Sequence, residues 1–166
     1  MLRLPTASKT LLNKNFAKFV SRRGYAEDVA ANTVLKLKFA LPHETIYDNT
    51  KVTQVNLPVQ SGHIGVLANH VPIAEQLKPG VIEIFEESLT STPKKYFVSG
   101  GFATVQPDST LCITSVEAFS LDSFSKENIS SLLSEANKNK SSSDAKIATE
   151  ASIQAEVLES LQAALK

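Results

Sequence analysis

Hydrophobic and polar residues alternate with a period of two along the middle of the chain. The apolar members of the first series are Leu35, Leu37, Phe39 and Leu41. Lys36 and Lys38 fall between them, and a second series follows at Val55, Leu57 and Val59. A period of two is typical of strands with one buried face. Both series therefore predict half-buried strands.

The alternation continues toward the carboxyl end and predicts four more strands, at 81–86, 94–99, 102–106 and 110–117. Turn residues separate these segments, at Lys78-Pro79-Gly80, Ser91-Thr92-Pro93, Gly100-Gly101 and Pro107-Asp108. Short strands at regular spacing favour an all-β sandwich or flattened barrel. We expect this domain to span residues 33–120.

The period lengthens after Phe124, which marks a second structural type. Ser125 is a plausible N-cap for a helix whose apolar positions are Ile129, Leu132, Leu133 and Ala136. Residues 137–144 form a polar turn. A second helix, capped by Ser143 or Asp144, has apolar positions at Ile147, Ala151, Leu158, Leu161 and Leu165. The pattern therefore predicts a helical hairpin over residues 121–166, whose two helices pack on each other and on the sandwich or a partner helix.

The first 25 residues have the composition of a mitochondrial transit peptide. They contain six basic and no acidic residues, with hydroxyl side chains between the bases and leucine and phenylalanine at roughly helical spacing. We expect cleavage between Tyr25 and Ala26, a flexible segment over 26–32, and a mature chain in the mitochondrial matrix. The alternative is a basic arm that stays attached and binds an anionic surface or nucleic acid.

Removal of this segment changes the charge of the chain. The whole sequence is formally neutral, whereas the part from Ala26 onward holds 11 basic and 17 acidic residues. An acidic chain disfavours a nucleic-acid partner. No apolar run approaches the roughly 20 residues that span a bilayer, so we expect no direct membrane insertion. The single cysteine, Cys112, excludes an internal disulfide, and we expect it to pack as a reduced thiol.

The sequence contains no convincing catalytic or metal-binding motif. The spacing of His43, His63 and His70 matches no standard ligand pattern. The glycines in Gly62-x-x-Gly65 and Gly100-Gly101 lack the lysine and helix of a phosphate loop, and turns explain them better. We expect His70 to be half-buried and to hold a loop by a side-chain hydrogen bond. The sequence therefore predicts a binding protein without a cofactor, as part of a larger assembly.

Two long motifs carry a resemblance to a known family. LPVQSGHIGVLANHVP lies at 57–72 and continues to LKPG at 77–80, and YFVSGGFATVQP lies at 96–107. They resemble the signature of the delta subunits of mitochondrial ATP synthases, the counterparts of bacterial and chloroplast epsilon subunits. The likeness runs from about Leu35 to Lys166, keeps the order of sandwich then hairpin, and looks closest to fungal members.

The resemblance implies a noncatalytic rotor subunit at the foot of the central stalk, on the matrix side of the inner membrane. Its implied partners are the gamma subunit, the small mitochondrial epsilon subunit and the ring of c subunits. The implied ring contact is a loop formed by Ser61, Gly62, His63 and Ile64. His63 occupies a position that is acidic in some bacterial members.

Three other interpretations stay open at this point. Bacterial relatives use the hairpin for inhibition, and some bind ATP through a motif that ends in Arg-Ala. Leu121-Asp122 match that motif, but Ser125 and Lys126 stand in place of the Arg-Ala pair, so we expect a structural hairpin. The remaining two are a free-standing β-sandwich binding module and a small metallohydrolase that uses His63 and His70.

Overall fold

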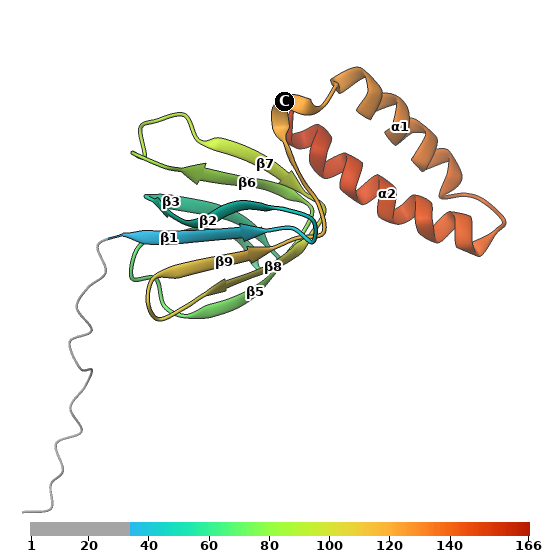
Figure 1. Ribbon diagram of the computed structural model, residues 1–166. Coiled ribbons are helices and arrows are strands. Elements are labelled where there is room, and N and C mark those ends of the chain that lie inside the picture. Colours follow the sequence, from blue (N-terminus) through green and yellow to red (C-terminus); the bar gives the residue numbers. More distant parts are fainter. Residues whose placement is uncertain (1–33) are drawn as a thin grey trace, which may run out of the picture. The chain divides into compact units, whose positions relative to one another are not determined.

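A computed structural model describes residues 34–166 (Figure 1). The predicted transit peptide, its cleavage between Tyr25 and Ala26, and the segment 26–32 lie outside these residues. The strands are β1 (Leu35–Ala40), β2 (Thr45–Val52), β3 (Gln54–Val59), β4 (Gly62–Val66), β5 (Ile73–Leu77), β6 (Gly80–Phe85), β7 (Lys94–Val98), β8 (Gly101–Val105), β9 (Thr110–Thr114) and β10 (Ala118–Ser120). A 3-10 turn, η2 (Leu121–Ser123), leads to helices α1 (Lys126–Asn139) and α2 (Ala145–Ala164). The predicted fold class, a β-sandwich followed by a helical hairpin, is confirmed.

Strand β3 joins two groups of strands. The hydrogen-bonded order is β10-β7-β6-β3-β5-β8-β9-β1-β2. One edge of β3 pairs with β6 through residues 54–56 and with β5 through Val59. Its other edge pairs with β4, which lies off this path. The pairings are antiparallel except that of β1 with β9, which is parallel.

The hydrophobic core lies between these strand groups. Strands β1, β3 and β6 contribute alternate side chains to it, as the period of two predicts. The fully buried members include Leu35, Leu37 and Phe39 from β1, Val55, Leu57 and Val59 from β3, and Ile82 and Ile84 from β6. These residues were the apolar positions of the predicted strands, so the pattern identified this part of the core.

The sequence pattern missed four strands and made another too long. β2, β4, β5 and β10 were not predicted, and the predicted strand over 110–117 ends at Thr114 as β9. Ser115 lies directly after β9, and its buried hydroxyl is 2.6 Å from the carbonyl oxygen of Gly100 and 2.8 Å from that of Glu117. The chain therefore turns after β9 and reaches β7 as a new strand.

Both helices begin at polar caps. Ser125 Oγ accepts a hydrogen bond from the Asn128 amide, and Asp144 Oδ1 accepts one from the Lys146 amide at 2.9 Å. These side chains satisfy amides that a first helical turn leaves unpaired. The predicted polar turn over 137–144 begins too early, since α1 continues to Asn139.

Small residues let the two helices approach closely. Ala136 of α1 and Ala151 and Ala155 of α2 are buried. Ile147 was placed in the apolar stripe by the sequence pattern, but its side chain is 44% exposed. Ala155, which the pattern did not select, is buried about one turn after Ala151.

The hairpin is attached to the sandwich by a second, smaller apolar cluster. Its buried members are Phe97 of β7, Ile129 of α1 and Leu161 of α2. The ring of Phe97 also meets that of Phe124 edge-on, with centroids 5.9 Å apart. Ser160 Oγ of α2 donates a hydrogen bond to the Pro79 carbonyl at 2.7 Å. The expected packing of the hairpin on the sandwich is therefore present.

Side chains connect the end strand β2 to the opposite strands. The Tyr47 hydroxyl donates to Glu86 Oε1 at 2.8 Å, and Lys94 Nζ lies 2.8 Å from the same oxygen. Burial raises the pKa of Tyr47 far above its usual range. The hydrogen bonds from Lys94 and then from Tyr47 lower the pKa of Glu86. This cluster links β2 to Glu86, which follows β6, and to Lys94 of β7, although β2 is not hydrogen-bonded to either strand.

We predict that Gly101→Ala destabilises the fold far more than Gly100→Ala. The two glycines have nearly the same φ, 150° and 149°. A Cβ at Gly101 would overlap the Thr114 carbonyl oxygen, whereas one at Gly100 would meet only an ordinary contact with Leu77. We expect the free energy of unfolding, measured with urea, to be lower for Gly101→Ala than for Gly100→Ala by about 2 kcal/mol or more. Equal losses would show that backbone strain, and not the close approach, sets the requirement for glycine.

We predict that Glu86→Gln makes stability less sensitive to acid. The folded-state pKa of Glu86 lies below the ordinary value of 4.5, so its contribution is complete above pH 4.5 and is lost as the pH falls through the folded value. Because this side chain is partly solvated, we expect an effect of about 0.5 kcal/mol. The free energy of unfolding is measured between pH 6 and pH 3 for this variant and for the control Glu87→Gln, which changes an exposed neighbour. If the control loses as little stability in acid as Glu86→Gln does, Glu86 is not the source of the acid sensitivity.

Candidate functional site

The hairpin between β3 and β4 holds the predicted ring-contact residues. Gln60 and Ser61 form a two-residue turn, while Gly62, His63 and Ile64 begin strand β4. The expected loop is therefore wrong for these three residues, which are extended and paired with Val59, Pro58 and Leu57. Ser61 and His63 are exposed, whereas Ile64 packs against the core. The core contact of Ile64 fixes the position of the exposed tip.

Glycine makes this tight turn possible. Gly62 has a φ of 141°, a conformation that side-chain-bearing residues rarely adopt. A Cβ at this position would meet no atom within 4 Å. The requirement for glycine at Gly62 is therefore conformational, and the space beside it is open to a partner.

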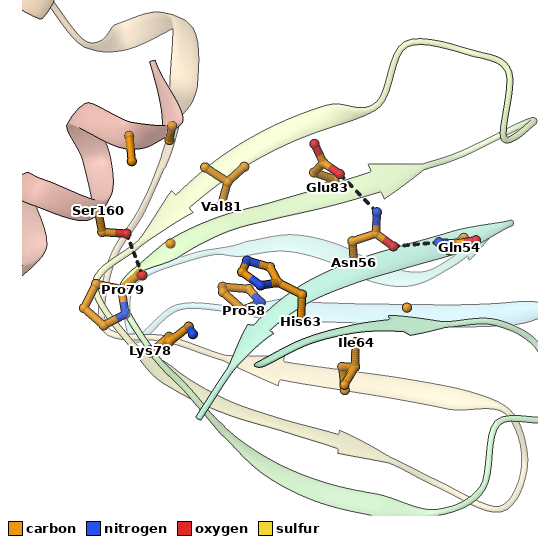
Figure 2. A pocket seen from close by; sticks show the side chains of 14 residues that line it. Gln54, Asn56, Pro58, His63, Ile64, Lys78, Pro79, Val81, Glu83 and Ser160 are labelled. Carbon is orange, nitrogen blue, oxygen red and sulfur yellow. Dashed lines mark hydrogen bonds between the residues drawn. The ribbon is translucent and has the colours of Figure 1, made fainter. Parts of the chain in front are cut away.

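A cleft lies beside this hairpin, over the outer face of β3, β4 and β6 (Figure 2). Its volume is about 630 Å³. The outward side chains of β3 line it, and Ser160, Ala163 and Ala164 of α2 form its opposite wall. His63 lies at the cleft next to Pro58, as Figure 2 shows.

A chain of hydrogen bonds crosses the floor of the cleft. Gln54 Nε2 donates to Asn56 Oδ1 at 2.6 Å, and Asn56 Nδ2 donates to Glu83 Oε2 at 3.0 Å. Lys95 Nζ pairs with the other Glu83 oxygen at 3.1 Å. The Asn56 hydrogen bond, followed by Lys95, lowers the pKa of the Glu83 carboxyl. Glu83 is therefore an ionised and fully partnered group at neutral pH, with no proton to transfer.

The sequence pattern did not single out Gln54, Asn56 or Glu83. They occupy the polar positions of strands that the pattern did predict. The alternation alone placed them on one outer face, but the pairing of Asn56 with Glu83 depends on the register of β3 and β6. That register is a long-range property that a period of two does not encode.

A second exposed region covers the outer face of β5, β8 and β9. Phe102 of β8 is 63% exposed and lies between Gln76 and Thr114 in the pairing register. The next row is formed by Ala74, Thr104 and Cys112. This face holds small or uncharged side chains around an exposed aromatic ring, a composition typical of the centre of a protein interface.

The remaining candidate residues show no catalytic arrangement. Within residues 34–166 no group of three or more His, Cys, Asp or Glu side chains could hold a metal ion. His43 lies beside Glu44 on the surface. His70 is half-buried, and its Nδ1 donates to the Val71 carbonyl at 2.8 Å, as predicted for a loop-holding histidine. The half-buried Cys112 accepts a weak contact from Gln106.

Among the described residues no helix is long and apolar enough to cross a membrane. The exposed turn, the cleft and the uncharged face are three separate surfaces of the described residues. Each offers contacts for another protein, and none brings a nucleophile next to a base.

Two family models match the chain. One, described as "ATP synthase, Delta/Epsilon chain, beta-sandwich domain", covers residues 34–118. The other, described as "Fungal epsilon subunit of F1F0-ATP synthase C-terminal domain", covers residues 124–163. The two matches correspond to the strands and to the helical hairpin.

Curated relatives match over nearly the whole chain. The mitochondrial ATP synthase subunit delta of Saccharomyces cerevisiae is 66% identical over 148 residues, which cover 89% of this chain and 91% of that protein. The protein of the same name in Kluyveromyces lactis is 63% identical over 166 residues, with both chains fully covered.

Solved structures match as well. One is a chain in the cryo-EM structure of Euglena gracilis mitochondrial ATP synthase, OSCP/F1/c-ring in rotational state 1, with a TM-score of 0.79, 30% identity and coverage of 86% of this chain and 88% of that one. A chain in the Tetrahymena thermophila central stalk/c-ring structure has a TM-score of 0.58 at 14% identity, which shows the fold alone. By its sequence, its two domains and their order, the chain belongs to the delta/epsilon chain family of ATP synthases.

Proposed function

We propose that this chain is a noncatalytic rotor subunit of the mitochondrial F-type ATP synthase. It belongs to the central stalk on the matrix side of the inner membrane, where it couples rotation of the c ring through gamma to ATP synthesis in the catalytic head. The observation that carries this proposal is the match of both domains, at 63% identity over the full length, to a mitochondrial ATP synthase subunit delta.

The fold suits a part that transmits torque. Each proton that crosses the membrane releases roughly 2.3 kcal/mol per 100 mV, and this free energy reaches the head only through contacts between subunits. A part that deforms easily would dissipate it. The sandwich resists deformation because its strands are hydrogen-bonded side by side over a densely packed core.

We assign the turn and first residues of β4 to the c ring. Ser61, Gly62, His63 and Ile64 form an exposed tip on a strand pair whose inner side chains are anchored in the core. The exposed polar side chains of Ser61 and His63 suit the polar loops that the resemblance places on the ring. A rigid hairpin would hold the ring without deforming under load.

We assign the uncharged outer face around Phe102 to gamma. Broad contact between flat faces resists twisting better than a single point, and this face carries the large exposed aromatic side chain that such an interface needs. The small mitochondrial epsilon subunit is the third partner, and we place it along the hairpin and the adjacent sandwich.

We divide the chain into a transit peptide (1–25), a short N-terminal segment (26–32), a sandwich domain (33–120) and a hairpin (121–166). Import into the matrix requires the basic leader, and its removal leaves an acidic chain. N-terminal sequencing of the protein purified from mitochondria should read Ala-Glu-Asp. A chain that retains Met1 inside mitochondria would contradict the cleavage between Tyr25 and Ala26.

We predict that Gly62→Glu weakens attachment of the ring to the stalk. The variant places a charged side chain into the open space at the tip, while Gly62→Ala introduces the same backbone strain without the charge. We expect at least a several-fold loss of proton-coupled ATP synthesis in Gly62→Glu relative to Gly62→Ala. ATP hydrolysis by the detached head should stay nearly intact, because no residue of this chain takes part in the chemistry.

Mitochondria that express each variant in place of the natural chain provide the measurement, with synthesis, proton leak and hydrolysis compared at equal amounts of enzyme. If synthesis and hydrolysis decline together, the tip does something other than seat the ring. If Gly62→Ala is as uncoupled as Gly62→Glu, the loss comes from the strained turn and the contact assignment is wrong.

A further inference from the structure

Three exposed lysines lie on the outer face of strands β1 and β2. Lys36 and Lys38 are the outward residues of β1, and Lys51 belongs to β2. Lys36 stands directly opposite Lys51 in the antiparallel pairing. Like charges in directly opposite positions destabilise a sheet. We call these three residues the lysine stripe, and folding alone does not explain their arrangement.

The lysine stripe has no carboxylate partner in the described part of the chain. None of the ion pairs between described residues includes one of its lysines. Asp48, which lies opposite Lys38 in the irregular part of β2, instead accepts a hydrogen bond from Asn49 at 3.1 Å. By contrast, Lys94 and Lys95 of β7 both contact carboxylates. The described part of the chain holds 11 basic and 15 acidic residues, so the stripe is unbalanced positive charge on an acidic chain.

The stripe is continuous with the uncharged face around Phe102. Strands β5, β8, β9, β1 and β2 are neighbours in the hydrogen-bonded order, and β5, β8, β9 and β1 lie side by side in Figure 1. The register places Lys38 beside Cys112, and Cys112 beside Thr104. Residues beside each other in register point to the same side of a sheet. The lysines and the aromatic ring therefore belong to one side of one sheet.

A stable interface centred on Phe102 has to cover the stripe as well. A standard interface buries about 800 Å² on each partner, which is a patch with a radius of about 16 Å. β1 and β2 are two and three strands away from β8, which carries Phe102, at about 10 and 14 Å. Covering an ammonium group without an opposite charge is strongly destabilising. The partner that covers Phe102 therefore has to bring carboxylates to the stripe.

We infer that the lysine stripe binds carboxylate side chains of the gamma subunit. The inference rests on the proposed function, which assigns the uncharged face around Phe102 to gamma, and it adds the charge that gamma carries beside that contact. Complementary charges fix the register of two partners and disfavour wrong orientations. The aromatic centre therefore supplies burial, and the stripe at its side sets the orientation in which gamma binds.

Zero-length cross-linking of the assembled ATP synthase tests this inference directly. A carbodiimide joins a lysine amine to a carboxylate only where the two groups are in contact, because it adds no spacer. Lys95 and Glu83, an ion pair within the chain, supply the internal control. Mass spectrometry should find a lysine of the stripe joined to an aspartate or glutamate of gamma. If the internal product forms and no such product with gamma does, the inference is overturned.

A charge reversal separates binding from folding. Lys36→Glu with Lys38→Glu converts the like-charge pair with Lys51 into one of opposite charge. The variant should therefore unfold at the same urea concentration as the natural chain or at a higher one. Its binding to gamma should nevertheless weaken, because carboxylates would face carboxylates. The matched control, Lys36→Arg with Lys38→Arg, keeps the positive charge at both positions.

Competition inside mitochondria measures this binding. Each variant is expressed beside an equal amount of the natural chain, and the ratio of the two chains in the purified enzyme is read by mass spectrometry. We expect the glutamate variant to be under-represented by about ten-fold or more, while the arginine variant matches the natural chain. Equal incorporation of the two variants would overturn the inference.

The outcomes distinguish this inference from the proposed function. If the chain co-purifies with gamma and the c ring, but the stripe is joined to carboxylates of another subunit or of a second copy, the rotor function stands and the assignment to gamma is wrong. If the chain does not co-purify with gamma and the c ring, the proposed function itself fails.

Discussion

The hydrogen bonding of β3 is the constraint on which the rest of the structure depends. β3 pairs with β6 and β5 along one edge and with β4 along the other, so both strand groups and the exposed hairpin share this strand. Its inward side chains, Val55, Leu57 and Val59, are fully buried. Pro58 of β3 packs closely on Gly80, where an added Cβ would lie only 2.8 Å from the Cβ of Pro58. Displacement of β3 would therefore disturb the core, the cleft and the tip together.

The same arrangement explains how the sites are positioned. The outward residues of β3 form the floor of the cleft, the turn after its carboxyl end holds Ser61, and one of its edges pairs with β4. The hairpin of helices contacts the sandwich through Phe97, Leu161 and the hydrogen bond of Ser160 to Pro79, near the end of the same cleft. A load applied at the tip would thus reach the core through paired main chains, as a coupling part requires.

Regular alternation made part of the fold predictable from the sequence. β1 and β3 follow it closely, and the N-cap residues Ser125 and Asp144 correctly marked where the helices begin. β2 was missed because its irregular pairing with β1 and the left-handed Asn49 break the period, so that Tyr47 and Val52 are its only buried members. β4 was missed because two of its five residues are glycine and it has a partner on one edge only.

The functional surfaces were less predictable than the family. The motifs at 57–80 and 96–107 carried the resemblance, and the comparisons confirmed it. The hydrogen-bonded floor of Gln54, Asn56 and Glu83 depends on strand register, which is set by residues distant in the chain. Local patterns describe which side of a strand faces inward, but they do not specify its neighbours.

The central claim, that this chain turns with the c ring and contacts it through the β3–β4 tip, is tested most directly by cross-linking. A chain with Ser61→Cys, and with Cys112→Ser to remove the other thiol, would be assembled into the mitochondrial enzyme together with c subunits that carry a cysteine in their polar loop. The account predicts a disulfide-linked product with the c subunit whose formation leaves ATP synthesis nearly unchanged, because both parts rotate as one body. A cross-link that stops synthesis, or no product in an enzyme that contains the chain, would contradict it.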